Sequence, residues 1–117
     1  MAKKKTKVGL DELLKIPELK KVNGTFQEAR GLMYRNRRRA RALLFEFKKP
    51  IKWKIHSLFV KFPFVAVWID KDHKIIKKKI IKPWSVEIGP DKPFTKLFEI
   101  PINEFYRREI KNLLALN

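Results

Sequence analysis

The sequence predicts an α+β domain: a small, mainly antiparallel β-sheet or barrel, with a capping helix near residues 26–34 and a C-terminal helix. Residues 42–100 alternate between apolar runs and turn-forming stretches, a pattern typical of strands. The segments before and after this region instead space their apolar residues as helices do. The chain has 117 residues, of which 44% are hydrophobic, so we expect one domain with one core.

Residues 1–24 are expected to form a basic N-terminal extension, followed by a single domain over residues 25–117. Residues 1–8 include four lysines and little apolar surface, so this part should become ordered only on a partner. Pro17 divides the apolar segment of residues 10–21, which predicts a short helix or two turns. Thr25 and Glu28 have the spacing of a capping box, which predicts that a helix follows over residues 26–34.

The central region predicts a succession of strands. Residues 42–47 form a short apolar strand, and residues 51–60 alternate, with Trp53, Ile55, Ser57 and Phe59 on one face. Residues 64–69 are apolar on both faces, as in a central strand. A turn at residues 70–73 leads to a lysine-rich strand at residues 74–82. After a proline-containing loop come a strand at residues 94–100 and a helix at residues 104–115 that Asn103 caps.

Positive charge is the strongest indication of function. The chain has 29 Lys and Arg against 12 Asp and Glu, a net charge of +17. Residues 1–82 contain 24 basic and 7 acidic residues, whereas residues 83–117 contain five of each. A small domain with this charge repels itself, so we expect a polyanionic partner on one face: RNA, DNA or, least of all, a membrane surface.

Other features of the composition indicate where in the cell the protein is located. The longest strongly apolar run, residues 62–69, has eight residues, whereas a membrane helix needs roughly 20. The chain contains no cysteine, which excludes disulfides and thiolate metal sites. We therefore expect a soluble, cytoplasmic protein, and the charged, isoleucine-rich composition resembles that of thermophile proteins.

The segment of residues 35–41 is the strongest candidate site, because it has five arginines in seven positions. A guanidinium group matches two phosphate oxygens at once, so this cluster could follow several phosphates of a folded RNA. The alternative is a solvated charged face, although Glu28 and Glu46 are the only acidic residues near it in the sequence.

Further candidates for nucleic-acid contact are lysines and exposed aromatic residues. The lysines of the strand at residues 74–82 could form a phosphate-facing ridge or protect a sheet edge, and those of the N-terminus could enter nucleic acid or only aid solubility. Most aromatic residues should lie in the core, and Tyr34 and Trp84 are the best candidates for base stacking. The predicted nucleic-acid-binding residues are Lys3, Lys4, Lys5, Lys7, Arg35, Arg37, Arg38, Arg39, Arg41, Lys48, Lys49, Lys52, Lys54, Lys77, Lys78, Lys79 and Trp84.

The sequence contains no recognisable catalytic or metal-binding pattern. His56 and His73 are the only histidines, too few for a metal site without cysteine. Asp70 and Asp72 stand beside lysines in a predicted turn, which favours a hairpin tip over an acid–base pair. Nucleotide-binding and hydrolase motifs are missing from the sequence. We expect no cofactor, no metal and no enzymatic activity.

Four motifs in order resemble the small family named domain of unknown function 192. Residues 31–35 are similar to its Gly-Leu-Met-Phe-Arg motif, residues 43–47 to its next strand, residues 55–70 to its long hairpin, and residues 97–101 to its closing Leu-Glu-Leu-Pro motif. The resemblance covers residues 25–101 and implies a β-rich, barrel-like domain whose biochemical role is not established. Val65 replaces a usual aspartate of the family, which speaks against a carboxylate-dependent activity, and the cluster at residues 37–41 resembles an addition.

We therefore expect an RNA-binding structural protein, in particular a small ribosomal component that contacts ribosomal RNA phosphates and neighbouring ribosomal proteins. No small-molecule substrate is expected. Two alternatives stay open: a small-ligand-binding or hydrolytic barrel of the resembled family, and an architectural DNA-binding protein. Charge alone does not separate RNA from DNA.

Overall fold

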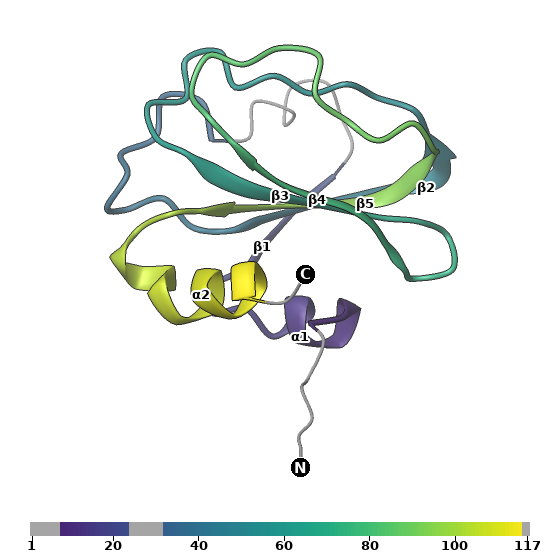
Figure 1. Cartoon of the computed structure of the whole chain (residues 1–117), viewed down its shortest axis with the longest axis horizontal. Coiled ribbons are helices and arrows are strands. Elements are labelled where there is room, and N and C mark those ends of the chain that lie inside the picture. Colours follow the sequence, from purple (N-terminus) through teal and green to yellow (C-terminus); the bar gives the residue numbers. More distant parts are fainter. Residues whose placement is uncertain (1–7, 24–31, 116–117) are drawn as a thin grey trace.

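A single five-stranded sheet organises the protein, and both helices pack on one of its faces (Figure 1). This computed structural model describes residues 8–23 and 32–115. The elements in chain order are α1 (Leu10–Leu14), β1 (Lys20–Asn23), β2 (Leu43–Ile51), β3 (Phe64–Ile69), β4 (Ile75–Ile81), β5 (Phe94–Pro101), the 3-10 helix η2 (Glu104–Tyr106) and α2 (Arg107–Ala115). The predicted α+β class, mainly antiparallel sheet and C-terminal helix are confirmed.

The sheet is open and does not close into a barrel. Its strand order is β1-β2-β5-β3-β4, so β1 and β4 are the edges. The β1–β2 pair is parallel, whereas β2–β5, β5–β3 and β3–β4 are antiparallel. The register between β2 and β5 shifts between Glu46 and Ile51, where Pro50 occupies an irregular part of the strand, as prolines in sheets usually do.

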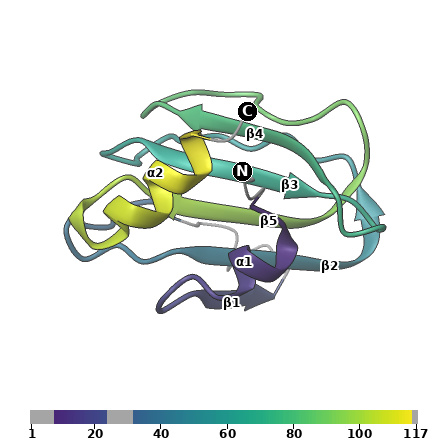
Figure 2. The ribbon, with the colours of Figure 1, turned by 60° about the horizontal axis from the view of Figure 1, so that its bottom comes forward.

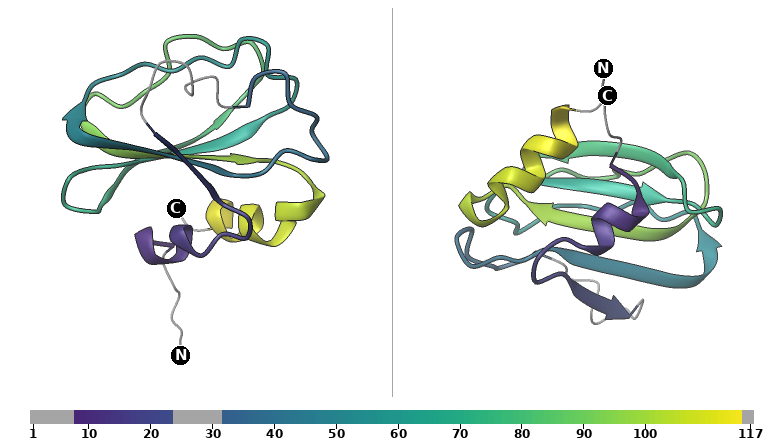
Figure 3. Two further views of the ribbon diagram at one scale, coloured as in Figure 1. Left: turned by 180° about the vertical axis from the view of Figure 1, so that it is seen from behind. Right: turned by 90° about the horizontal axis from the view of Figure 1, so that it is seen from below.

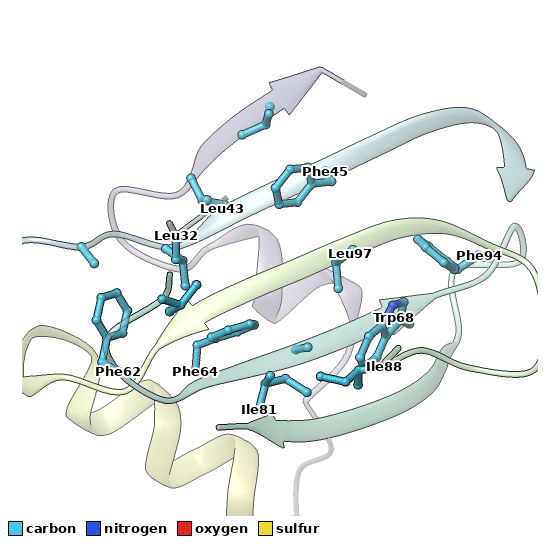
Figure 4. Close-up of a cluster of buried hydrophobic side chains, with 14 residues drawn as sticks. Leu32, Leu43, Phe45, Phe62, Phe64, Trp68, Ile81, Ile88, Phe94 and Leu97 are labelled. Atoms are coloured by element: carbon cyan, nitrogen blue, oxygen red, sulfur yellow. The ribbon is translucent and has the colours of Figure 1, made fainter. Parts of the chain in front are cut away.

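The centre of the sheet is buried on both faces because β3 lies between β4 and β5. Successive side chains of a strand point to opposite faces, so β3 contributes to two apolar clusters. Phe64, Ala66 and Trp68 belong to one cluster, and Val65, Val67 and Ile69 to the other. Figure 4 shows the first cluster, in which Leu97 of β5 and Phe45 of β2 lie on the same face as Phe64 and Trp68.

One face of the sheet is covered by α1 and α2, which lie across the strands (Figure 2). Ile110 and Leu113 of α2 and Leu13 of α1 are buried there. The Tyr106 hydroxyl accepts a hydrogen bond from the Ala42 N–H and donates one to the Pro17 carbonyl, both at 2.8 Å. Tyr106 thus links the C-terminal helix to the segment that follows α1 and to the residue before β2. Among the described helices, none is long and apolar enough to span a bilayer.

Two irregular segments, residues 52–63 and 82–93, cover the other face, which we call the loop face (Figures 1 and 3). They are joined by an antiparallel bridge in which Ile55 and Ile88 exchange backbone hydrogen bonds of 2.8 and 3.0 Å, and by backbone bonds of Ser57 with Ser85 and Trp84 at 2.8 and 2.9 Å. Val60, Phe62 and Ile88 are buried against the sheet. Gly89 passes so close to residue 53 that a Cβ atom there would lie 2.8 Å from the Trp53 carbonyl oxygen.

Some sequence predictions need correction. The predicted strand at residues 51–60 is wrong, because beyond Ile51 its backbone groups bond to other loops and no neighbouring strand is available. Most of the predicted helix at residues 26–34 lies outside the described residues, and Leu32–Tyr34 form a turn. The proposed extension of residues 1–24 does not describe residues 8–23, since Leu13 and Ile16 are buried in the helix-side core.

Candidate nucleic-acid interface

The arginine-rich segment of residues 35–41, called the arginine loop below, is built around one turn. The Asn36 side-chain oxygen accepts a hydrogen bond from the Arg38 N–H at 2.9 Å. The Asn36 carbonyl accepts from the N–H groups of Arg39 and Ala40 at 3.1 and 2.8 Å. An asparagine that bonds to the backbone two residues later is a common way to fix a turn. The loop therefore has a defined backbone conformation.

The arginine loop is also attached to the end of β5. The Asn103 side-chain amide donates to the carbonyls of Arg37 and Ala40 at 2.8 and 3.0 Å, and its oxygen accepts from the Tyr106 N–H at 3.1 Å. The Arg37 Nε–H donates to the Ile102 carbonyl at 2.9 Å. The predicted N-cap at Asn103 is confirmed, and the same side chain holds the loop in place. A loop held in this way loses little further entropy on binding a ligand.

The arginines of the loop fall into two groups. Arg41 is used inside the protein: its Nε lies 3.4 Å from a Glu18 carboxylate oxygen, and its guanidinium carbon lies 3.8 Å from the centre of the Phe105 ring. The other four, Arg35, Arg37, Arg38 and Arg39, are exposed. Within the described residues, none of these four has a carboxylate within 4.0 Å. Their charge is therefore available to an external anion.

A hollow between the arginine loop and α2 adds further positive charge. Its lining includes Arg37, Arg38 and Arg41 from the loop, together with Arg107 and Lys111 from α2. Glu104 is the one acidic residue of the lining, and it lies 3.8 Å from Arg107. The basic residues of α2 were not predicted, because residues 83–117 are neutral as a whole and hide a local excess of charge.

The predicted lysines do not all join this surface. Lys48, Lys49, Lys52 and Lys54 are exposed, and they lie in the second half of β2 and just after it. Lys3, Lys4, Lys5 and Lys7 lie outside the described residues.

The lysines of β4 do not form one ridge. The Lys77 ammonium group donates to the Gly89 carbonyl on the loop face at 3.1 Å, whereas the Lys78 ammonium group donates to the Leu113 carbonyl of α2 at 2.6 Å. Their position on an edge strand is the one in which lysines hinder pairing with another sheet.

Next to the arginine loop, three exposed aromatic rings form an aromatic cluster: Tyr34, Phe59 and Trp84. Tyr34 and Phe59 stack with ring centres 5.3 Å apart, and Phe59 meets Trp84 edge to face at 4.9 Å. Their exposed fractions are 62%, 41% and 59%, which is unusual for large aromatic side chains. Tyr34 and Trp84 were predicted to be exposed, whereas Phe59 was assigned to a strand face and was missed.

The backbone holds the aromatic cluster in an uncommon geometry. Tyr34, Phe59 and Trp84 have φ angles of 62°, 65° and 62°, in the left-handed region that favours glycine. Each such residue costs about 1–2 kcal/mol relative to a right-handed conformation. Backbone strain of this kind is concentrated at functional sites, because packing must maintain it.

Hydrogen bonds of buried Ser57 and of Phe59 join the three segments that carry the aromatic cluster. The Ser57 hydroxyl accepts from the Ser85 N–H at 2.7 Å and donates to the Lys82 carbonyl at 2.5 Å. The Ser57 carbonyl accepts from the Trp84 N–H at 2.9 Å, and the Tyr34 N–H donates to the Phe59 carbonyl at 3.0 Å. The rings therefore stand on a connected hydrogen-bond network.

A second candidate site is a pocket of about 180 Å³ on the loop face, which we call the Glu99 pocket. Glu99 lies between Leu43 and Ala66 on the neighbouring strands, and it is the buried acidic residue of the described core. Lys54 and His56 lie among the lining residues as the other ionisable groups. The complete lining is Leu32, Phe45, Phe47, Trp53, Lys54, Ile55, His56, Val60, Phe64, Leu97 and Glu99.

The apolar surroundings change the ionisation of Glu99. Burial removes water from the carboxylate and raises the pKa of Glu99 from 4.5 to about 8. No described residue forms a hydrogen bond or an ion pair with this carboxyl group. At neutral pH Glu99 is therefore mainly a neutral acid, which can both donate and accept a hydrogen bond. Val65, which stands where the resembled family usually has an aspartate, packs instead in the apolar cluster under the helices.

The fold and these surfaces define a small α+β sheet domain with helices behind the sheet and loops in front of it. Residues 8–113 match the family DUF192, described as "Uncharacterized ACR", and the chain belongs to this family. The resemblance found in residues 25–101 is thus confirmed, and the match extends beyond it on both sides.

Two solved structures share the fold. A protein of unknown function from Novosphingobium aromaticivorans superposes with a TM-score of 0.63 at 15% identity, over 77% of this chain and 66% of that one. A "putative transcription regulator" from Sinorhizobium meliloti gives a TM-score of 0.64 at 20% identity, over 85% of this chain and 74% of the other. This chain thus spans about two thirds to three quarters of their length. At these identities the likeness concerns the fold alone. No curated protein matches the chain.

Proposed function

We propose that this protein binds RNA as a structural partner and has no catalytic role. The proposal rests on the arginine loop, in which Asn36 and Asn103 fix the backbone while four guanidinium groups remain exposed. Guanidinium groups bind phosphate oxygens in pairs, and contacts to phosphates supply most of the affinity for nucleic acid. The neighbouring hollow, with Arg107 and Lys111, extends the phosphate-binding surface along α2.

The aromatic cluster favours single-stranded segments over a duplex. Unpaired bases stack on exposed aromatic rings, and each stacked base contributes about 1–3 kcal/mol. Tyr34 directly precedes the arginine loop, while Lys61 and Lys82 lie two residues from Phe59 and Trp84 and are exposed. A strand whose bases stack on Tyr34 and Trp84 would have its phosphates near these cations. Because sequence-specific RNA-binding proteins mostly recognise unpaired loops, a folded RNA is the favoured partner.

A small ribosomal component is the particular role that we propose. The protein has a net charge of +17, as expected of a protein whose charge is neutralised by ribosomal RNA. Such a role would place the protein in the cytoplasm, beside other ribosomal proteins. Single-stranded DNA offers the same phosphates and bases, so an architectural DNA-binding role is the alternative that an experiment has to separate.

The test measures how affinity depends on salt. Fluorescence anisotropy would follow binding of single-stranded RNA, single-stranded DNA and duplex DNA of equal length between 50 and 200 mM salt, a range chosen because phosphate contacts are strongly salt-dependent over it. Replacing Arg35, Arg38 and Arg39 by alanine should reduce the slope of log affinity against log salt by about 2, since each contact to a single strand contributes about 0.7. Replacing Lys71, Lys74 and Lys92 removes the same charge at the opposite end of the sheet and should change the slope less.

Two results would contradict the proposal. Affinity that does not depend on salt would exclude binding through phosphates, and equal slopes in the two triple variants would exclude the arginine loop as the contact surface. Stronger binding to duplex DNA than to RNA would favour the architectural alternative. Cosedimentation with ribosomes, and release by high salt, tests the ribosomal role separately.

A further inference from the structure

The Glu99 pocket has the composition of a site for a flat, neutral ring. Four of its lining residues, Phe45, Phe47, Trp53 and Phe64, are aromatic. Phe47 meets Trp53 edge to face with ring centres 5.6 Å apart, so this wall has a defined shape. A volume of about 180 Å³ lies below the roughly 300–1,000 Å³ of pockets for drug-sized molecules. The pocket therefore suits one small ring system.

The charges around the pocket select against ions. Lys54 and His56 line it together with Glu99, and the whole chain has a net charge of +17, which disfavours a cationic ligand. An anionic ligand would meet the Glu99 carboxyl group in apolar surroundings, where unpaired charges are costly. A purely aliphatic ligand would leave that carboxyl group without a partner. A neutral ring with a polar edge brings no charge into the pocket and gives the Glu99 carboxyl group a hydrogen-bond partner.

The hydrogen-bonding groups narrow the choice further. A neutral carboxyl group presents a donor and an acceptor side by side, which matches an edge where an N–H lies next to a carbonyl or a ring nitrogen lies next to an amino group. Nucleobases present such edges on flat rings that stack against aromatic side chains. A sugar would need many polar partners, whereas Glu99, Lys54 and His56 are the only charged or titratable side chains in the lining.

We infer that the Glu99 pocket binds one nucleobase, with Glu99 bonded to its Watson–Crick edge and the aromatic wall against its ring. The inference rests on the proposed RNA binding, because it identifies the pocket as the place where an unstacked base enters. Leu32 lines both the Glu99 pocket and the depression that contains Arg35 and Arg39. A nucleotide with its base in the pocket thus has phosphate-binding groups nearby.

The first experiment uses free nucleosides, which lack phosphate. Uridine, cytidine, adenosine and guanosine would be titrated into the ¹⁵N-labelled full chain, and amide shifts followed by NMR. Saturable shifts at Phe45, Ile55, Leu97 and Glu99 are expected for at least one nucleoside. Absence of shifts, or shifts confined to Tyr34, Phe59 and Trp84, would overturn the inference.

Three variants make the test specific. Glu99→Gln keeps a donor and an acceptor and should retain binding within about threefold, whereas Glu99→Leu should weaken it tenfold or more, because a buried polar edge is left unpaired. Glu87→Leu removes an exposed glutamate outside the pocket and should have no effect. Ile55→Phe narrows the pocket without touching Glu99 and should also weaken binding. Equal affinity of Glu99→Leu and the unchanged protein would overturn the inference.

Oligonucleotides separate this inference from the proposed function. If the base comes from an RNA strand, Glu99→Leu should abolish the preference among U, C, A and G homopolymers and keep the salt dependence. If the ligand is a free nucleoside, that variant should lose nucleoside binding alone. RNA binding with no base preference and no nucleoside binding would refute the pocket and leave the proposed function intact. Nucleoside binding without RNA binding would support the pocket and refute the proposed function.

Discussion

At the scale of single residues, we expect Glu99 to make stability depend on pH. Its pKa of about 8 in the folded protein lies above the ordinary value of 4.5, since burial disfavours the charged form. Between pH 4.5 and 8 the folded protein holds a proton that the unfolded chain has released, so rising pH favours unfolding in this window. Lys54 and His56 line the same pocket, but the Lys54 ammonium group donates to the Gly89 carbonyl and the His56 Nδ1 accepts from the Leu58 N–H.

Glu99→Gln should therefore remove a pH-dependent loss of stability. Between pH 4.5 and 8, the unfolding free energy of Glu99→Gln should rise relative to that of the unchanged protein. The rise should be about 1.4 kcal/mol for each pH unit. Outside this range the difference should stay constant, because both states are then protonated or both ionised. Urea unfolding from pH 4 to 9 measures this difference. A constant difference across the whole range would mean that Glu99 ionises in the fold as it does in water.

Trp84 allows strain and binding to be separated. Trp84→Ala and Trp84→Gly both remove the ring, so both should lower the affinity for single-stranded RNA by about 1–3 kcal/mol. Glycine accepts the φ of 62° without a Cβ penalty, so Trp84→Gly should be more stable to urea than Trp84→Ala by about 1 kcal/mol. Equal stability would show that the residue does not keep its left-handed conformation, and unchanged affinity would exclude Trp84 from the RNA contact.

The candidate residues show how far sequence reasoning reaches. The arginine loop and Trp84 could be predicted, because five arginines in seven positions and a tryptophan near a basic stretch can be read directly from the sequence. Glu99 could not, since one glutamate between Phe98 and Ile100 looks like a residue on the outer face of a half-buried strand. Its burial depends on Trp53, Ile55 and Val60 of the loop face, which line the same pocket and are distant from it in the sequence.

At the scale of elements, the strands differ in how readily they are predicted. β3 was located correctly at residues 64–69, because an apolar run on both faces is characteristic of a central strand. β1 was missed, because Lys-Lys-Val-Asn has no strand pattern and its parallel pairing with β2 is non-local. Residues 52–60 alternate as a strand does, yet they form no strand: their backbone bonds to residues 82–93 are limited to the bridge of Ile55 with Ile88 and the bonds of Ser57 with Trp84 and Ser85. Trp53 and Phe59 of the predicted face are 42% and 41% exposed, so alternation here predicts neither the pairing nor the burial.

A side chain at residue 89 should destabilise the loop that contains Gly89. A Cβ atom at residue 89 would lie 2.8 Å from the Trp53 carbonyl, and the Gly89 carbonyl also accepts from Lys77. Gly89→Ala should therefore lower the unfolding free energy by about 1–3 kcal/mol, as overpacking does, and thermal unfolding would measure it. Gly9→Ala is the matched control, since its nearest contact is a Glu12 side-chain oxygen at 3.4 Å. An equal effect of both changes would contradict the close packing of this loop on residue 53.

At the scale of the whole molecule, charge repulsion opposes folding. The dimensions are 46 × 33 × 22 Å, and the net charge is +17. The screening length is about 30 Å at 10 mM salt and about 8 Å at 150 mM. At low salt every cation thus interacts with most others across the protein, whereas at physiological salt only near neighbours interact. A polyanionic partner would relieve the same repulsion more effectively than dissolved ions, because it places phosphates directly beside the cations.

Thermal unfolding should reveal this repulsion without any RNA. The Tm should rise as NaCl increases from 10 to 150 mM, and relief of about 1 kcal/mol corresponds to roughly 4–8 °C in a domain near this size. Lys48→Glu with Lys49→Glu changes two exposed residues and removes four units from the net charge of +17, so the rise should be smaller in that variant. A Tm that stays constant or falls with salt would mean that the cations are already neutralised within the chain, and the main reason to expect a polyanionic partner would be lost.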